Sequence, residues 1–389
     1  MAAGARSDNP QPLSRFIVPI AALIGFGLCI AGVAVLVDPK GGAHLLANFY
    51  DLLGNGSGAT ALRNGQGDQL FAKVLLALIA LAVGVGGIWL LFIGVGWLVS
   101  QLRPLWRDRI LPWVFVGPAL ALLAVYLVYP AAGTVWRSFF DNHGNFTFGN
   151  YTILATPDFA VILRNNIIWL IVATAGSVFL GLVIAGLFDR VRREALAKTF
   201  IFLPLAISLI GASVIWSFMY AWEPASKPQI GLLNAVITGL GGQPVAFLTV
   251  SPLNIFAEIV IMIWLQTGFA MVVLSAAIKG VSTEIIEAAR LDGATERQLF
   301  FRVIVPMIRG SIITVATTIA IVTLKIFDIV YVLTGGRFGD DVVAVRMFHE
   351  MFQFFNDGYA AALATVLFIA VLPVMYINLR NFRRQQVES

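Results

Sequence analysis

The sequence predicts an all-α polytopic membrane protein with eight transmembrane helices. Of its 389 residues, 59% are hydrophobic and only 12% are charged, whereas soluble domains carry about twice that charged fraction. Eight segments are long and apolar enough to cross a hydrocarbon layer of about 30 Å, which requires about 20 helical residues. None shows the short alternating pattern of barrel strands. The segments are residues 16–37, 72–100, 111–136, 166–188, 200–222, 253–277, 310–333 and 360–380.

The first span resembles a secretion signal in its position. It is long, lacks an A-x-A-like cleavage site at its end and is followed by seven further spans, so we expect it to be retained. The predicted order along the chain has five parts. They are a tail at 1–15, two spans within 16–110 around a Gly- and Asn-rich outer loop at 38–71, a six-span unit at 111–383 and a tail at 384–389.

Basic residues are distributed unevenly between the two sides of the predicted membrane. With the N-terminus inside, seventeen of the 26 Lys and Arg residues lie in cytoplasmic segments and eight in outer segments, while Lys325 lies within a span. This matches the positive-inside rule, so we expect both termini in the cytoplasm. The net charge of +5 therefore reflects topology and does not indicate nucleic-acid binding.

Few residues offer catalytic or metal-binding chemistry. Cys29 is the only cysteine, which rules out an intrachain disulfide. His44, His143 and His349 lack the spacing of a zinc site. No Gly-Lys pair occurs in the chain, so the phosphate-binding pattern G-x-x-x-x-G-K-[ST] is missing. The sequence predicts no catalytic residue, no metal site and no bound cofactor.

A charged segment at 278–309 interrupts the apolar sequence, and its centre reads STEIIEAARLDGATERQLFFRVIVP. Ser282 or the threonine after it can cap a helix. Gly293 can end that helix, because glycine adopts the left-handed conformation at low cost. Thr295 and Gln298 then fit a capping box at the start of a second helix. The segment is predicted to form a helix, a glycine turn and another helix.

Two interpretations of this segment remain open from its residues. The two helices could lie on the lipid head groups next to the membrane. However, the polar face mixes acids and arginines, and Ala288 and Ala289 make the apolar side beside Ile285 and Leu291 shallow. These features favour close docking to a protein.

The segment also resembles a known motif. The order EAA, three residues, Gly, nine residues and VIVP is similar to the EAA loop in permease subunits of binding-protein-dependent ABC importers, whose usual ending is I-x-L-P. The resemblance implies a type I importer permease core, preceded here by two extra N-terminal helices, and a coupling helix seated on an ATPase subunit. The residues implied in this coupling are Glu287, Ala288, Ala289, Asp292 and Gly293.

Further strings extend the resemblance over roughly residues 111–383. FIFLPLAISLIGASVIWSFMY, GLLN and KIFDIVYVLTGG look like the sugar-importer branch related to the maltose permease. GGRFGDDVVAVRMFHEMF is similar to a string in α-glucoside and glucosylglycerol permeases. The implied substrate is a glucoside or oligosaccharide: an α-glucoside, a trehalose-, sucrose- or maltose-like sugar, or glucosylglycerol.

A sugar path requires hydroxyl-bonding and aromatic side chains, and IWLQTGFAM combines Trp264, Gln266, Thr267 and Phe269. Alignment with the maltose permease implies further positions on the path. Ordinary helix packing is the alternative interpretation. The expected path residues are Trp264, Leu265, Gln266, Phe269, Val322, Thr323, Lys325 and Ile326.

Three charged residues within predicted spans could have a structural or functional role. Lys325 and Asp328 are three residues apart, so they would share one helical face and neutralise each other. A structural ion pair and a pathway-lining role both remain open, and in either case the two side chains would face protein or water. Glu258 lies near the outer end of the sixth span, within reach of solvent.

The resemblance implies an assembly in the inner (cytoplasmic) membrane. Its other members would be a second homologous permease, two ATPase subunits that use ATP and Mg²⁺, and an extracytoplasmic solute-binding protein. An ion-coupled secondary transporter or channel is the main alternative, although no row of carboxylates crosses the predicted spans. A membrane-embedded enzyme or assembly factor is a second alternative, and no cluster of catalytic residues supports it.

Overall fold

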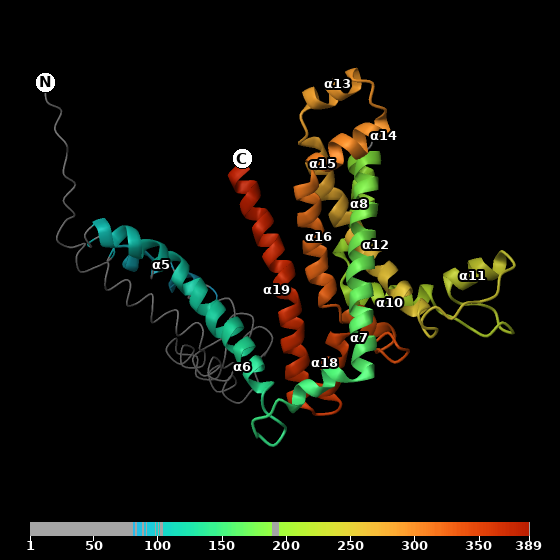
Figure 1. Cartoon of the computed structure of the whole chain (residues 1–389), viewed down its shortest axis with the longest axis horizontal. Helices are drawn as coiled ribbons and strands as arrows, with labels where there is room; N and C mark the ends of the chain where they lie inside the picture. Colours follow the sequence, from blue (N-terminus) through green and yellow to red (C-terminus); the bar gives the residue numbers. More distant parts are fainter. Residues whose placement is uncertain are drawn as a thin grey trace, which may run out of the picture. The chain divides into compact units, whose positions relative to one another are not determined.

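The computed structural model describes residues 104–188 and 194–388, together with part of 81–101 (Figure 1). The chain divides into two compact units, residues 1–129 and 130–389. Four predicted segments fall wholly or largely outside the described residues. They are the tail 1–15, the span 16–37, the outer loop 38–71 and much of the span 72–100.

The first unit is described mainly through α5 (Pro104–Leu123) and the π-helical turn η1 (Ala124–Val128). Pro112 and Pro118 lie inside α5 without ending it. The stretch Leu111–Arg137, which ends with α6 (Tyr129–Arg137), is helical throughout and is apolar enough to cross a membrane. The predicted span 111–136 is therefore a single helix in the structure.

The described residues contain four helices that are individually long and apolar enough to span a membrane. Two further pairs of helices pass the same test together, but one pair is bent by 100° and the other by 70°. The described residues thus hold up to six candidate spans, and each span expected after residue 110 overlaps one of them. The candidates are Leu111–Arg137, Pro157–Phe188, Leu253–Lys279 and Asp357–Arg380, with the pairs Glu194–Ala206/Leu209–Met219 and Glu296–Met307/Arg309–Leu324.

The second unit is a helical bundle in which α8 (Thr174–Phe188) packs along α12 (Leu253–Lys279). Small residues bring these helices together. A Cβ added to Gly181 would lie 2.4 Å from the Cβ of Ala270, a distance that real Cβ atoms essentially never show. The absence of a side chain at Gly181 therefore sets how closely the two helices approach.

The other elements complete the bundle and its connections, and the described residues contain no strand, only a single bridge between Phe140 and Phe146. These elements are η2 (Gly149–Ala155), α7 (Pro157–Ile168), η3 (Trp169–Ala173), α9 (Glu194–Phe202), η4 (Leu203–Ala206), α10 (Leu209–Met219), α11 (Leu232–Gly239), α13 (Thr283–Leu291), α14 (Glu296–Gln298), η5 (Leu299–Ile304), α15 (Val305–Met307), α16 (Arg309–Leu324), α17 (Asp328–Leu333), α18 (Val343–Phe352) and α19 (Asp357–Glu388).

The prediction of one continuous helix over 310–333 is wrong. α16 ends at Leu324 and α17 begins at Asp328, so Lys325 and Asp328 do not share a helical face, and no ion pair joins them among the described residues. The break has a tertiary cause. The buried Asn166 of α7 donates to the Leu324 carbonyl over 3.4 Å, and Ile326 packs into the apolar core. The hydrogen bond from Asn166 satisfies the last carbonyl of a helix that ends inside the protein.

The expectation that Glu258 reaches solvent is also wrong. Its side chain is fully buried in α12 and accepts a hydrogen bond of 3.2 Å from the hydroxyl of Thr334. Hydropathy predicts the position of Glu258 along its span. It does not predict that the loop after α17 covers this side chain. Glu258 is therefore part of the protein interior.

Candidate functional site

The charged segment forms the predicted helix, glycine turn and helix at one end of the second unit, where α13 lies beyond the ends of α8 and α16 (Figure 1). Gly293 has a φ of +83° and follows the end of α13. Thr295 N–H donates to Gln298 Oε1 over 2.9 Å, and Gln298 N–H donates to the Thr295 hydroxyl over 3.3 Å. The glycine stop and the capping box are both confirmed.

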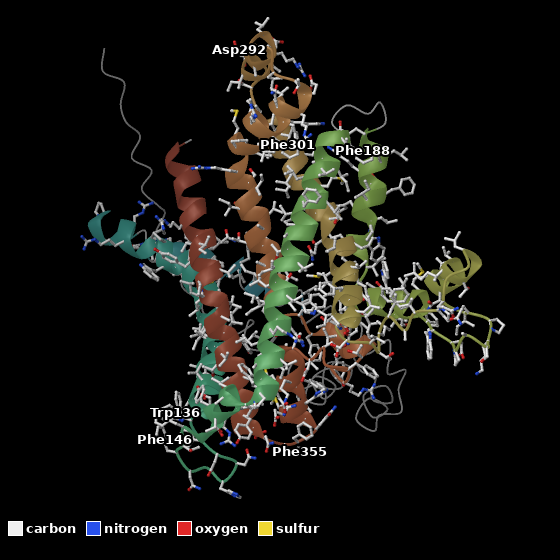
Figure 2. All side chains as sticks on the ribbon, turned by 45° about the vertical axis from the view of Figure 1, so that its right-hand side comes forward. Trp136, Phe146, Phe188, Asp292, Phe301 and Phe355 are labelled. Atoms are coloured by element: carbon white, nitrogen blue, oxygen red, sulfur yellow. The ribbon has the colours of Figure 1, made fainter. Side chains whose placement is uncertain are left out.

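α13 is supported on one side and open on the other. Ile286 and Ala289 pack against the apolar cluster formed around α12 and α16. On the open side the side chain of Leu291 is 89% exposed, next to the acids of this loop. Figure 2 places Asp292 at the tip of the segment.

Charge interactions stabilise the loop at both ends of α13. The Arg290 guanidinium contacts the Glu296 carboxylate at 3.2 Å and so connects α13 to α14. The backbone N–H of Glu284 and the Ser282 hydroxyl lower the pKa of the Glu284 carboxyl below its usual range. An ionised acid is thus held in the first turn, where the helix dipole favours negative charge. Of the residues implied in coupling, Ala289 is half-buried, and the exposed ones are Glu287, Ala288, Asp292 and Gly293.

The expected path residues of α12 divide into accessible and buried side chains. Trp264, Gln266 and Phe269 are partly exposed, whereas Leu265 is buried. Thr267 is also buried and donates to the carbonyl of its own helix four residues earlier, over 2.6 Å. Only Trp264, Gln266 and Phe269 could contact a sugar without rearrangement of the helix.

The path residues near the end of α16 divide in the same way. Val322 and Lys325 are exposed, whereas Thr323 and Ile326 are buried. The Thr323 hydroxyl donates within its own helix to the carbonyl of Ile319 over 2.9 Å. Ile326 lies in the same apolar cluster as Leu265, so the structure brings these two together as core residues.

Sequence reasoning missed a buried polar cluster that joins α7 and α12 to the loop after α17. Asn254 Nδ2 donates to Asp340 Oδ2 over 3.0 Å and to the Phe338 carbonyl over 3.1 Å. Asn165 Nδ2 donates to the carbonyls of Gly339 and Asp341, each over 2.9 Å. Asparagine and acidic residues at the ends of apolar spans were the signal that could have found it.

The same loop contains a carboxyl with an unusual ionisation. Burial raises the pKa of Asp341 to about 7, although the Arg346 guanidinium and the Val342 N–H oppose this shift. Gly336, at φ +72°, makes room for this side chain, because a Cβ there would lie 2.7 Å from Asp341 Oδ1. Asp341 therefore titrates near neutral pH in a loop held by buried amides.

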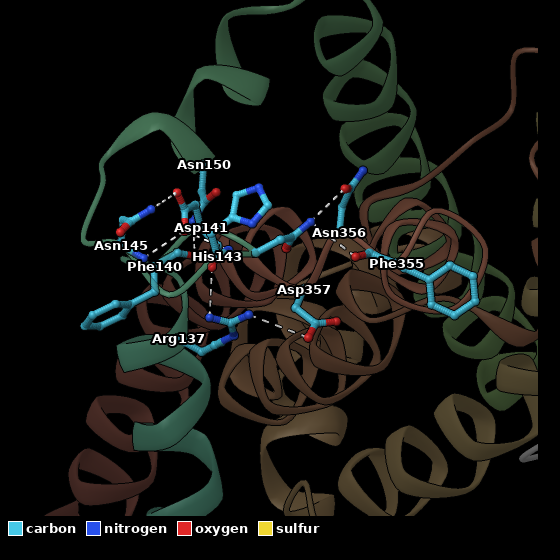
Figure 3. A network of polar contacts seen from close by, with 10 residues as sticks. Arg137, Phe140, Asp141, His143, Asn145, Asn150, Phe355, Asn356 and Asp357 are labelled. Carbon is cyan, nitrogen blue, oxygen red and sulfur yellow. Dashed lines mark hydrogen bonds and ion pairs between the residues drawn. The ribbon is translucent and has the colours of Figure 1, made fainter.

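A second polar network, drawn in Figure 3, lies where α18 meets α19, at the other end of the second unit from α13 (Figure 1). Asn142 Nδ2 donates to the Phe355 carbonyl over 3.3 Å and to Asn356 Oδ1 over 3.1 Å. The Arg137 guanidinium lies 3.7 Å from the Asp357 carboxylate. These contacts connect the loop after α6 to the turn between α18 and α19.

The described residues include no group of three His, Cys, Asp or Glu side chains placed to hold a metal ion.

A bundle of apolar spans, two of them sharply bent, with an exposed helix–glycine–helix loop at one end, is the architecture of a membrane permease. The comparison with known sequences identifies its family. Residues 56–385 match the family described as "Binding-protein-dependent transport system inner membrane component", and the chain belongs to this family.

Relatives with sugar or osmoprotectant names include the following two. The osmoprotective compounds uptake permease protein GgtC of Synechocystis sp. is 50% identical over 276 residues, which cover 70% of this chain and 99% of GgtC. The α-glucoside transport system permease protein AglF of Rhizobium meliloti is 43% identical over 331 residues, which cover 82% of this chain and 98% of AglF. In this family the permease is non-catalytic, and the ATPase is a separate subunit.

Solved structures show the same fold. A bacterial alginate ABC transporter in complex with an alginate pentasaccharide-bound periplasmic protein matches with a TM-score of 0.61 and 20% sequence identity, covering 72% of this chain and 98% of the other. A bacterial importer of alginate matches with a TM-score of 0.58 at the same identity, covering 72% and 99%. The predicted importer permease fold is thus confirmed.

Proposed function

We propose that this chain is the permease subunit of an ATP-driven importer that carries a glucoside from a solute-binding protein into the cytoplasm. The end of the bundle with α13 faces the cytoplasm, as do both termini. α13 docks on one of two ATPase subunits, which use ATP and Mg²⁺. A second, homologous permease completes the path, and the whole assembly lies in the inner membrane.

The exposure of Leu291 is the observation that carries the proposal. A leucine with 89% of its surface exposed, beside the polar turn at Gly293, is unfavourable in water and has no cover within the described chain. A helix lying on lipid would need a broad apolar face. α13 instead exposes the small Ala288 together with acids, which suits a pocket on another protein.

The sugar path is proposed to use the accessible members of the expected set. Trp264 and Phe269 offer aromatic faces, and Gln266 offers an amide donor and acceptor on the same helix. Val322 lies in the last turn of α16, and Lys325 directly follows this helix. Because Leu265, Thr323 and Ile326 are buried in this structure, we assign them to the support of the path.

The substrate class is inferred from the two relatives. One is named for α-glucosides and the other for osmoprotective compounds, and both share the family of this chain. We therefore infer an α-glucoside, a trehalose-, sucrose- or maltose-like sugar, or glucosylglycerol. Import requires that ATP and sugar each favour one of two global states of the permease.

The experiment reconstitutes this chain with its second permease, ATPase and binding protein in proteoliposomes, and measures ATP-dependent sugar uptake and retention of the ATPase. Gly293→Val forces a β-branched residue into the left-handed conformation of the coupling turn. Gly144→Val is the matched control, because Gly144 has a φ of +84° and a Cβ at either glycine would meet no other atom within 4 Å.

Gly293→Val should lose the ATPase and sugar uptake while the permease stays inserted, and Gly144→Val should retain the ATPase. Normal uptake with Gly293→Val would overturn the coupling role of α13. Uptake that continues without ATP and collapses with an ionophore would instead identify an ion-coupled transporter.

A further inference from the structure

α10 and α11 form an arm that projects sideways from the bundle, and Figures 1 and 2 agree on this placement. The chain bends by 100° between the helix ending at Ala206 and the start of α10. Ser208 caps α10 by accepting a hydrogen bond of 3.0 Å from the Gly211 N–H. The bend and the helix cap therefore fix the direction in which the arm leaves the bundle.

The far part of the arm is held rigidly by one buried side chain. Asn234 of α11 donates to the carbonyls of Ala221 and Val245, each over 3.0 Å, and accepts from the Val245 N–H over 2.7 Å. A Cβ on Gly231 would lie 2.1 Å from the Ala221 carbonyl oxygen, so the backbone at Gly231 packs closely against the backbone at Ala221. These contacts fix α11 against the end of α10.

The outer surface of the arm is apolar. Leu232, Val236 and Leu240 are spaced by four residues and share one face of the α11 segment. Leu240 is 85% exposed, and Ile230 and Phe218 are more than 70% exposed. We call the set formed by Val214, Phe218, Ile230, Leu232, Val236 and Leu240 the arm surface.

The arm is almost free of charge. Between Lys198 and Glu258 the only charged residues are Glu223 and Lys227, and these form an ion pair of 3.4 Å with each other. A water-exposed loop between two spans normally carries charged residues that keep it solvated. An uncharged arm with an apolar surface suits burial in a low-dielectric environment.

Lipid alone would be a poor cover for this arm. In Figure 1 the arm lies beside the bundle, between the end that carries α13 and the end where α18 meets α19. It is therefore level with the candidate spans. The segments on either side of α11, residues 220–231 and 240–252, are not helical. Irregular backbone at membrane depth must be covered by protein or line a water-filled cavity, because hydrocarbon cannot satisfy its polar groups.

We propose that the arm surface is the interface with the second permease subunit. This inference rests on the importer function proposed above. The second permease is the partner at the same membrane depth, whereas an ATPase and a binding protein dock from the two aqueous sides. Interfaces between permanently associated subunits are also more hydrophobic than transient interfaces. The uncharged, apolar arm fits an interface of this kind.

The experiment co-expresses this chain with its second permease and ATPase and measures both partners retained on the purified chain. Leu240→Lys places a charge in the arm surface, and Leu291→Lys is the matched control, since it places the same charge at an equally exposed leucine of α13. Leu240→Lys should lower the retained second permease about tenfold. Leu291→Lys should lower the ATPase and leave the second permease in place.

A photoreactive amino acid at position 240 tests the same contact in a chain that still assembles. It should cross-link to the second permease. Cross-links only to lipid, or only to another copy of this chain, would overturn the interface, as would full retention of the second permease with Leu240→Lys. If the wild-type chain retains no second permease or ATPase, the importer function itself fails, which separates that outcome from a failure of the interface.

Discussion

Asn254 and Asp340 are joined by a hydrogen bond of 3.0 Å, and both side chains are fully buried. Asn254 lies in the first turn of α12, and Asp340 lies in the loop between α17 and α18. The bond therefore fixes the loop to the start of the most deeply buried helix of the second unit. Glu258, one turn further along α12, is covered by the same loop through Thr334.

Asn254→Ala should destabilise the permease by about 2 kcal/mol, because it leaves the Asp340 carboxyl and the Phe338 carbonyl without their buried donor. The measurement is the thermal unfolding of the purified chain in detergent. Gln353→Ala is the control, since Gln353 is exposed in the turn after α18. Equal unfolding temperatures for the two variants would show that the amide does not hold the loop.

Two Gly→Ala substitutions should have effects of opposite sign. Gly181→Ala places a Cβ 2.4 Å from the Ala270 Cβ and 2.9 Å from the Met271 nitrogen, so α8 and α12 must move apart at a cost of about 1–3 kcal/mol. At Gly133 in α6 a Cβ meets nothing within 4 Å, and alanine should stabilise the helix by about 0.5–1 kcal/mol. Thermal unfolding of both variants checks the sign of each effect.

Asp341 should make the permease less stable as the pH rises. Its pKa is raised from 3.8 to about 7 in the folded chain, chiefly by burial. Between about pH 4 and pH 7 the unfolded chain has lost this proton while the folded chain keeps it. The contribution of Asp341 to the free energy of unfolding therefore falls through this window and is constant above it.

Asp341→Asn keeps the oxygen that accepts from Val342 N–H over 2.9 Å but cannot ionise. The decrease in the free energy of unfolding from pH 4 to pH 8 should be smaller in this variant than in the wild type, by an amount on the order of 2 kcal/mol after allowance for the partial exposure of the side chain. Unfolding of both proteins at a series of pH values measures this difference. Identical pH profiles would contradict the buried neutral carboxyl.

Gln266→Ala should raise the sugar concentration needed for half-maximal uptake by about tenfold or abolish uptake, because a lost hydrogen bond to a sugar hydroxyl costs about 1–1.5 kcal/mol. Assembly with the partners should be unchanged. Thr267→Val is the matched control on the same helix, since the Thr267 hydroxyl is buried and bonded to its own backbone. An unchanged half-maximal concentration with Gln266→Ala would remove this residue from the path.

The local features of the α13 loop could be predicted from the sequence because their causes are local. A left-handed glycine at Gly293 and the reciprocal bonds of Thr295 and Gln298 involve residues within three positions of each other. The apolar spans follow in the same way from length and composition. The family resemblance likewise rested on a short string of residues, and the match over residues 56–385 confirms it.

Tertiary structure decided where the spans break and which polar groups are buried. The helix predicted over 310–333 ends at Leu324 because Asn166, some 158 positions earlier in the chain, caps its carbonyl. Glu258 is buried because a later loop covers it, and Leu265 and Ile326 meet in one core. Hydropathy records how apolar each segment is. It does not record which distant amide will satisfy a helix end. Long-range hydrogen bonding and packing therefore decide where the helices end and which side chains are buried.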